Sequence, residues 1–166
     1  MEKRMEPQTR IKILVGIPCS GKSTYAKTLP KNMGKYTVII SRDTIREFVR
    51  LFIQPYKFSK QNEDLVTTEF YRQFNLWLEP ERGCFEVCLD NTHCQQKYID
   101  RIICDYGKTY EIQIKFFDIS LVKAHYRNII RYLKIGKWIP INIMNLMYKN
   151  YNKINKKKYE KYLVYE

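Results

Sequence analysis

Gly16-Ile17-Pro18-Cys19-Ser20-Gly21-Lys22-Ser23 fits the pattern G-x-x-x-x-G-K-[ST], and the rest of the chain is organised around it. The apolar run 11–15 directly before it predicts a buried strand, and residues 23–29 directly after it predict a helix that Pro30 ends. In this order of strand, loop and helix, two glycines let the backbone curl, so that successive N–H groups point at phosphates with the positive helix end behind them. A glycine-containing turn that carries a lysine by chance is the alternative, at about one per cent. The stretch therefore predicts a nucleotide-binding site.

The side chains of this loop have expected tasks. We expect Lys22 to reach the β- and γ-phosphates of ATP, and Ser23 to place its hydroxyl on Mg²⁺. We expect Cys19 to be a small filler rather than a nucleophile, although a thiol at a helix terminus can be open to oxidation. The residues predicted to bind the nucleotide here are Gly16, Cys19, Ser20, Gly21, Lys22, Ser23 and Thr24.

The length of 166 residues predicts a single domain, 1–166, that buries a core without disulfides or structural metals. Residues 1–9 are polar, and we expect them to be flexible. They lack the apolar core of a signal peptide, and no apolar run approaches the length of a membrane span. We therefore expect an intracellular protein, cytoplasmic or nuclear, without a membrane partner.

The net charge is strongly positive, because 30 Lys and Arg stand against 17 Asp and Glu and give +13. A basic surface concentrates polyanions, which points to a nucleic-acid partner. A biased genome that over-uses Lys, Asn, Ile and Tyr would produce the same composition. The charge alone leaves both explanations open.

Strand-like and helix-like segments alternate along the rest of the chain. Strands are expected at 36–40, 84–89 and 110–117, the last of them near a sheet edge because its apolar residues alternate. Helices are expected at 44–52, 62–79, 95–106 and 120–132, with a last one that starts at Pro140. This alternation predicts an α/β fold with a parallel sheet of about four to five strands and helices on both faces.

Polar residues follow the second and third predicted strands. Ligands in open α/β sheets bind beyond the carboxyl ends of the strands, so Asp43, Arg46 and Asp90 are expected to face the phosphate loop. Each of them has a structural alternative. Asp43 suits the N-cap of the helix that follows it, Arg46 suits a solvated surface, and Asp90 suits a turn.

Together these segments resemble the 5′-hydroxyl polynucleotide kinases, both the phage type and the kinase half of the animal end-repair enzyme. The resemblance covers nearly the whole chain in order, and it implies a P-loop kinase fold with a helical lid. It rests on Gly-x-Pro-x-Ser-Gly-Lys-Ser-Thr at residues 16–24, Arg42-Asp43 followed by Thr44-Ile45-Arg46, Asp90-Asn91-Thr92-His93, and a late element with Arg127, Asn128, Arg131 and Ile139-Pro140.

The resemblance also implies roles for residues near the acceptor. Asp43 would be the base that takes the proton of an incoming 5′-hydroxyl. Arg46, about one helical turn from Asp43, would hold the acceptor's own phosphate. Asp90 and Thr92 would also bind substrate, and Asp90 stands where P-loop proteins keep a second acidic residue near the metal.

The predicted lid carries basic residues. The resemblance implies that Arg131 clamps the transferring phosphates and, with Lys22 and Asp43, completes the catalytic group. Arg127 would bind the nucleotide too, and Lys137 is a neighbour able to share the role. The alternative is a basic helix end favoured by the helix dipole, and both interpretations stay open.

His93 stands where the resembled pattern has Asn, so its binding role is in doubt. The nearby cysteines suggest zinc, but their spacing fits no common zinc pattern and two of them fall on a predicted strand, so we expect no metal cage. Free thiols are the default for an odd number of cysteines in an intracellular chain. The five cysteines are Cys19, Cys84, Cys88, Cys94 and Cys104.

The tail, residues 151–166, interleaves lysines with tyrosines. Lysines beside stacking rings suit single-stranded nucleic acid. A solvated helix end whose tyrosines pack on the body is the interpretation that we favour.

The function predicted from the sequence is transfer of the γ-phosphate of ATP, with Mg²⁺, to the 5′-hydroxyl end of DNA or RNA in nucleic-acid repair. One alternative is a small-molecule kinase on the same scaffold, for which the charge has no obvious purpose. The other is a nucleotide-dependent nucleic-acid-binding protein without transfer activity. The Asp-x-Asp-Gly-Thr signature of the phosphatase domain that accompanies such kinases is not found, so we expect no 3′-phosphatase activity.

Overall fold

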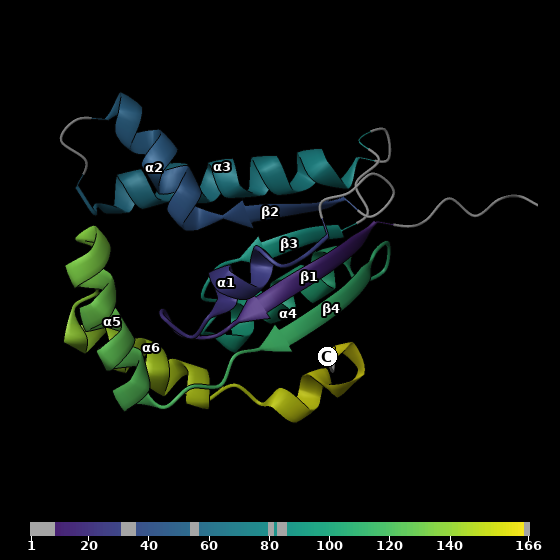
Figure 1. Cartoon of the computed structure of the whole chain (residues 1–166). Coiled ribbons are helices and arrows are strands. Elements are labelled where there is room, and N and C mark those ends of the chain that lie inside the picture. The colour runs from purple at the N-terminus through teal and green to yellow at the C-terminus, as the bar shows by residue number, and fades with distance from the viewer. Residues whose placement is uncertain (1–8, 31–35, 54–56, 80–81, 83–85, 165–166) are drawn as a thin grey trace, which may run out of the picture.

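The computed structural model describes residues 9–30, 36–53, 57–79, 82 and 86–164. Strands and helices alternate along the chain as the sequence predicts (Figure 1). The elements are β1 (Arg10–Val15), α1 (Lys22–Ala26), β2 (Thr37–Ser41), α2 (Arg42–Phe52), α3 (Lys60–Leu78), β3 (Glu86–Asp90), α4 (Gln96–Tyr106), β4 (Glu111–Phe116), α5 (Leu121–Ile135), α6 (Ile141–Asn152) and the 3₁₀ helix η2 (Lys156–Tyr162).

The described strands form one parallel sheet in the order β2-β3-β1-β4. The predicted α/β fold is confirmed, and β4 lies at an edge as its alternating pattern indicates. In the register of the sheet, Leu14 and Ser41 both pair with Asp90, so β1, β2 and β3 end side by side. The phosphate loop, the start of α2 and the loop after β3 therefore meet at one edge of the sheet.

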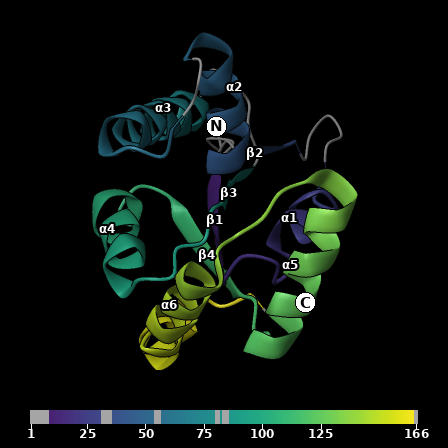
Figure 2. The same cartoon turned by 90° about the vertical axis from the view of Figure 1, so that its left-hand side faces the viewer.

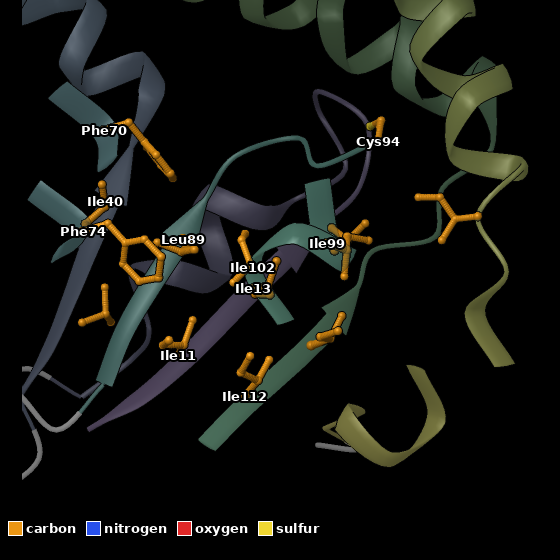
Figure 3. Close-up of a cluster of buried hydrophobic side chains, with 14 of the residues drawn as sticks. Ile11, Ile13, Ile40, Phe70, Phe74, Leu89, Cys94, Ile99, Ile102 and Ile112 are labelled. Atoms are coloured by element: carbon orange, nitrogen blue, oxygen red, sulfur yellow. The ribbon is translucent and has the colours of Figure 1, made fainter. Parts of the chain in front are cut away.

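Alternate side chains of the strands face two hydrophobic clusters. Ile11 and Ile13 of β1 pack in the larger cluster, which includes buried residues of α3 and α4 (Figure 3). Leu14 packs in a smaller cluster with Ala26 of α1. Figure 2 shows the same layering, with α3 and α4 on one side of the sheet and α1 and α5 on the other.

Several helix boundaries differ from the sequence prediction, among them those of α1 and α2. α1 ends at Ala26 rather than near residue 29, because the amide of Thr28 donates to the carbonyl of Tyr25 in a turn before Pro30. α2 begins at Arg42, and its N-cap position is Ser41. The alternative in which Asp43 caps this helix is therefore wrong. Asp43 lies in the first turn, where the helix dipole favours a carboxylate.

The basic tail is docked on the body of the protein. Tyr159 is fully buried, and its hydroxyl donates to Asp100 of α4 at 2.7 Å. Leu163 forms a parallel bridge with Ile114, so the segment after η2 lies beside β4. Tyr151 is also buried, with its hydroxyl 2.9 Å from a carboxylate oxygen of Asp118. These two tyrosines therefore cannot serve as stacking platforms for nucleic acid.

Some predictions fall on residues outside the described ranges, namely the expected flexibility of residues 1–8, the expected start of the third strand at 84–85, and the expectations for Cys84 and Tyr165. The cysteines that the structure describes are free thiols, as predicted. Within the described ranges, no helix combines the length and the apolar character needed to cross a membrane.

Candidate active site

The two glycines of the phosphate loop are required for different reasons. A Cβ atom on Gly16 would lie 2.8 Å from Oγ of Ser20 and 3.0 Å from Cβ of Phe117, so the close approach of these segments excludes a side chain. Gly21 has open space around it but a φ of +105°, a conformation that costs glycine little. Cys19 also has a positive φ, 63°.

Lys22 is folded into this loop. Its ammonium donates to the carbonyl oxygens of Gly16 at 2.9 Å and Ile17 at 2.7 Å, and lies 3.3 Å from Oγ of Ser20. Burial lowers the pKa of Lys22, and the nearby Cys94 and Asp90 act in the opposite direction. The loop thus holds a buried cation next to the backbone amides that would cradle a phosphate.

Ser23 and Asp90 meet where β3 ends. Burial raises the pKa of Asp90, and the hydroxyl of Ser23, which donates a hydrogen bond to its carboxylate, acts against that rise. A hydroxyl and a carboxylate are the hard oxygen ligands that Mg²⁺ prefers, so the pair fits the predicted metal. Within the described residues there is no cluster of three or more His, Cys, Asp or Glu arranged for a metal.

Asp43 lies at the same edge of the sheet as Ser23 and Asp90. Its negative charge acts on both Lys22 and Asp90, and it raises the pKa of each. The side chain of Asp43 is 65% exposed, so an incoming acceptor can reach it. The phosphate loop and Asp43 therefore lie at the same edge of the sheet.

Arg46 is held in place by two carboxylates. It forms an ion pair with Asp43 at 2.6 Å, which confirms the predicted one-turn spacing, and two further bonds to Glu63 of α3 at 2.8 and 2.9 Å. Arg42 reaches the same Glu63 at 3.1 Å. Sequence reasoning missed Glu63, because no local spacing connects α3 with these arginines.

The loop after β3 forms a backbone hydrogen bond with the phosphate loop. The amide of Gly16 donates to the carbonyl of Thr92 at 3.1 Å, so Thr92 contacts the loop through its backbone. His93 is buried with a φ of 43°, and its Nδ1 lies 3.1 Å from the carbonyl oxygen of Leu14. Because that oxygen can only accept, Nδ1 carries the proton of a neutral ring. His93 therefore braces the end of β1 instead of facing a ligand.

The burial of His93 predicts a pH effect on stability. Burial lowers the pKa of His93 to about 4 from an ordinary value near 6.5, so between these values the unfolded chain binds a proton that the folded chain does not. Stability must then fall as the pH drops through this window. The variant His93→Asn, with a residue that tolerates positive φ, should lose about 2 kcal/mol less than the wild type between pH 7 and pH 5.

Urea denaturation at the two pH values measures this difference. His125→Asn, which changes the other histidine at a half-exposed position on α5, is the matched control and should follow the wild type. Equal losses in His93→Asn and the wild type would show that His93 does not produce the acid sensitivity.

The lid helix α5 contacts the phosphate loop directly. A guanidinium nitrogen of Arg127 donates to the carbonyl oxygen of Cys19 at 3.1 Å. Arg131 is half-buried one turn further along the same helix. After α5, the ammonium of Lys137 lies 2.7 Å from Glu47 of α2, the helix that carries Asp43. The structure thus brings Arg127 to the phosphate loop and Lys137 to the helix that carries Asp43.

Asn128 fixes the segment that follows the lid helix. Its side chain is fully buried, accepts from the amide of Ile139 at 3.2 Å and donates to the carbonyl of the same residue at 2.8 Å.

Burial raises the pKa of Cys94 to about 11, so the thiol beside Lys22 stays protonated at neutral pH. A nucleophilic role for Cys94 is therefore not supported.

A family profile for AAA domains matches residues 11–140. The fold is similar to a chain of the Pnkp1/Rnl/Hen1 RNA repair complex, with a TM-score of 0.76 and 22% identity over 95% of this chain and 48% of that chain. A chain of a Pnkp1/Rnl/Hen1 complex matches with a TM-score of 0.59 and 23% identity over 76% and 42% of the two chains. A gluconokinase from Sinorhizobium meliloti 1021 matches with a TM-score of 0.58 and 14% identity over 96% and 82%.

The chain spans about half the length of the first two matched chains. A search of curated proteins found no match. At these identities the structural likenesses concern the fold, and they confirm the fold of P-loop kinases.

Proposed function

The chain belongs to the AAA domain family of P-loop proteins, and on that premise we propose that it is a polynucleotide kinase, which transfers the γ-phosphate of ATP to the 5′-hydroxyl end of DNA or RNA. One observation carries the proposal. An exposed carboxylate, Asp43, lies in the first turn of α2, at the same edge of the sheet as the phosphate loop that holds the buried ammonium of Lys22. Phosphoryl transfer needs a base on the acceptor side and positive charge on the phosphate side, and this pair supplies both.

Each polar residue has a task in this reaction. Asp43 accepts the proton of the 5′-hydroxyl as its oxygen attacks the γ-phosphorus, and the bond to the β-phosphate oxygen breaks to release ADP. Arg46, fixed by Glu63, holds the acceptor's own phosphate. Lys22 and the lid arginine Arg131 stabilise the charge that develops on the transferring group.

Ser23 and Asp90 would hold Mg²⁺, which neutralises phosphate oxygens when it is bound. Thr92 and Arg127 are the other proposed binding residues. The backbone carbonyl of Thr92 accepts a hydrogen bond from the phosphate loop, and Arg127 donates one to a carbonyl of that loop. Arg127 reaches the loop directly, which favours a binding role over that of an ordinary basic helix end.

The distribution of charge supports a polyanionic acceptor. No Asp or Glu occurs between Asp118 and Glu160, a stretch that includes the lid helix and α6. The basic residues in it are Lys123, Arg127, Arg131, Lys134, Lys137, Lys149, Lys153, Lys156, Lys157 and Lys158. Such a field attracts a nucleic-acid strand, with one negative charge per phosphate, more strongly than a small acceptor such as gluconate with a single negative charge. The likeness to a fold from an RNA repair complex agrees with this acceptor.

A labelling experiment tests the proposal. The protein is incubated with γ-labelled ATP and Mg²⁺ together with a 5′-hydroxyl oligonucleotide, the same oligonucleotide with a 5′-phosphate, a nucleoside, or gluconate. We expect label only in the 5′-hydroxyl oligonucleotide, and a 3′-phosphate on that strand should be retained. Label in gluconate or the nucleoside would indicate a small-molecule kinase. Binding of the oligonucleotide without any label would indicate a binding protein without transfer activity.

A further inference from the structure

Phe58 is a large aromatic side chain that the core does not use. It lies between α2 and α3, and it is 73% exposed. Single exposed apolar residues are common on protein surfaces, so exposure alone indicates nothing. Its surroundings distinguish Phe58 from such a residue, because its backbone is fixed and its ring lies beside the proposed acceptor site.

The backbone around Phe58 is fixed by the beginning of α3. Oγ of Ser59 caps this helix by accepting from the amide of Asn62 at 3.2 Å. The side chain of Asn62 in turn donates to the carbonyl of Lys57 at 2.8 Å, and the amide of Ser59 donates to the same carbonyl at 2.9 Å. Hydrogen bonds to Lys57 and Ser59 therefore fix the main chain on both sides of Phe58, and this fixes the position from which the exposed ring projects.

The ring is linked to the proposed base through one residue. The guanidinium carbon of Arg46 lies 5.8 Å from the centroid of the Phe58 ring, a distance at which a cation and a ring attract each other. The same guanidinium is paired with Asp43 at 2.6 Å. An acceptor whose 5′-oxygen reaches Asp43 carries its first base one sugar away, and the contact with Arg46 places the exposed ring of Phe58 on that side. Lys57 and Lys60 beside it are exposed cations for the phosphates that follow.

We propose that Phe58 is the platform on which the base of the 5′-terminal nucleoside stacks, and that the enzyme therefore selects strands whose 5′ end is unpaired. The inference rests on the proposed function, since it names the acceptor of the same site. A ring stacks on any base, so this contact selects an unpaired end without selecting its sequence. A base in a blunt duplex is already stacked on its neighbour and paired, and it must leave both contacts to reach the ring.

The test compares Phe58→Ala with Phe52→Ala. Phe52 is equally exposed at 73%, but it lies nine positions after Asp43 on α2, half a helical turn around the axis, where its ring contacts Phe48. The acceptors are a single-stranded 5′-hydroxyl oligonucleotide and the same strand with an abasic 5′-terminal sugar. We expect Phe58→Ala to raise the KM for the normal strand about 5- to 150-fold with the KM for ATP unchanged, and Phe52→Ala to match the wild type.

The abasic strand separates stacking from a structural effect. The wild type should lose a similar factor on it, Phe58→Ala should no longer distinguish the two strands, and Phe58→Trp should restore the distinction. Fluorescence anisotropy of the labelled strands provides a second readout that needs no transfer. If the wild type labels both strands equally, the platform is wrong while the kinase stands. If it labels neither strand, the proposed function and the platform fail together.

Discussion

Replacement of Asp43 by Asn is expected to lower kcat for transfer to a 5′-hydroxyl oligonucleotide by about 10²- to 10⁴-fold, the usual contribution of a general base. The amide is nearly the same size as the carboxylate but cannot take a proton. ATP binding should be spared, because Asp43 lies outside the phosphate loop and Lys22 donates hydrogen bonds to carbonyl oxygens of that loop. Single-turnover transfer and nucleotide titration measure the two effects separately.

A matched control for this variant exists on α3. Glu69 forms an ion pair with Arg72 three residues along α3, as Asp43 does with Arg46 along α2. Glu69→Gln therefore removes a similar ion pair that lies away from the phosphate loop and Asp43, and it should leave kcat unchanged. A variant Asp43→Asn that transfers phosphate at the normal rate would remove Asp43 from the role of base.

The second large effect concerns stability and needs no assumption about function. Lys12 of β1 and Glu86 of β3 form a buried ion pair at 3.2 Å, and each side chain is only 5% exposed. Lys12→Met should lower the free energy of unfolding by about 3–5 kcal/mol, because it leaves the carboxylate of Glu86 buried without its partner. Urea denaturation at neutral pH measures the loss.

Two comparisons separate pairing from packing in that experiment. Arg10→Met breaks the neighbouring exposed pair with Glu111, and it should cost no more than about 1 kcal/mol. The double variant Lys12→Met/Glu86→Leu removes both charges, and it should recover most of the stability that the single variant loses. A double variant that is less stable than Lys12→Met would show that the pair stabilises the fold by more than mutual neutralisation.

The parts of the site that follow from local pattern were accessible from the sequence. The phosphate loop has a fixed spacing and a fixed context of strand and helix, and Asp43 follows a strand whose carboxyl end must face that loop. The capping alternative for Asp43 differs from the observed position by only two residues, a margin within which helix boundaries cannot be read from sequence.

Other parts depend on contacts between distant segments. Glu63 supports Arg46 from 17 positions away, and no periodicity reports such a contact. The buried ring of His93 depends on a carbonyl 79 positions away, in β1. The tail illustrates the same point, since its alternation of Lys and Tyr fits both a stacking surface and a docked segment. Only the burial of Tyr159 decides between them.

The ion pair between Lys137 and Glu47 determines how easily the segment after α5 separates from α2. It joins the segment after the lid to the helix of the proposed base, yet both side chains are nearly half exposed, at 43% and 49%. Water and salt screen such a pair, so it holds the two walls together only weakly. The contact between α2 and the segment after α5 therefore costs little free energy to break.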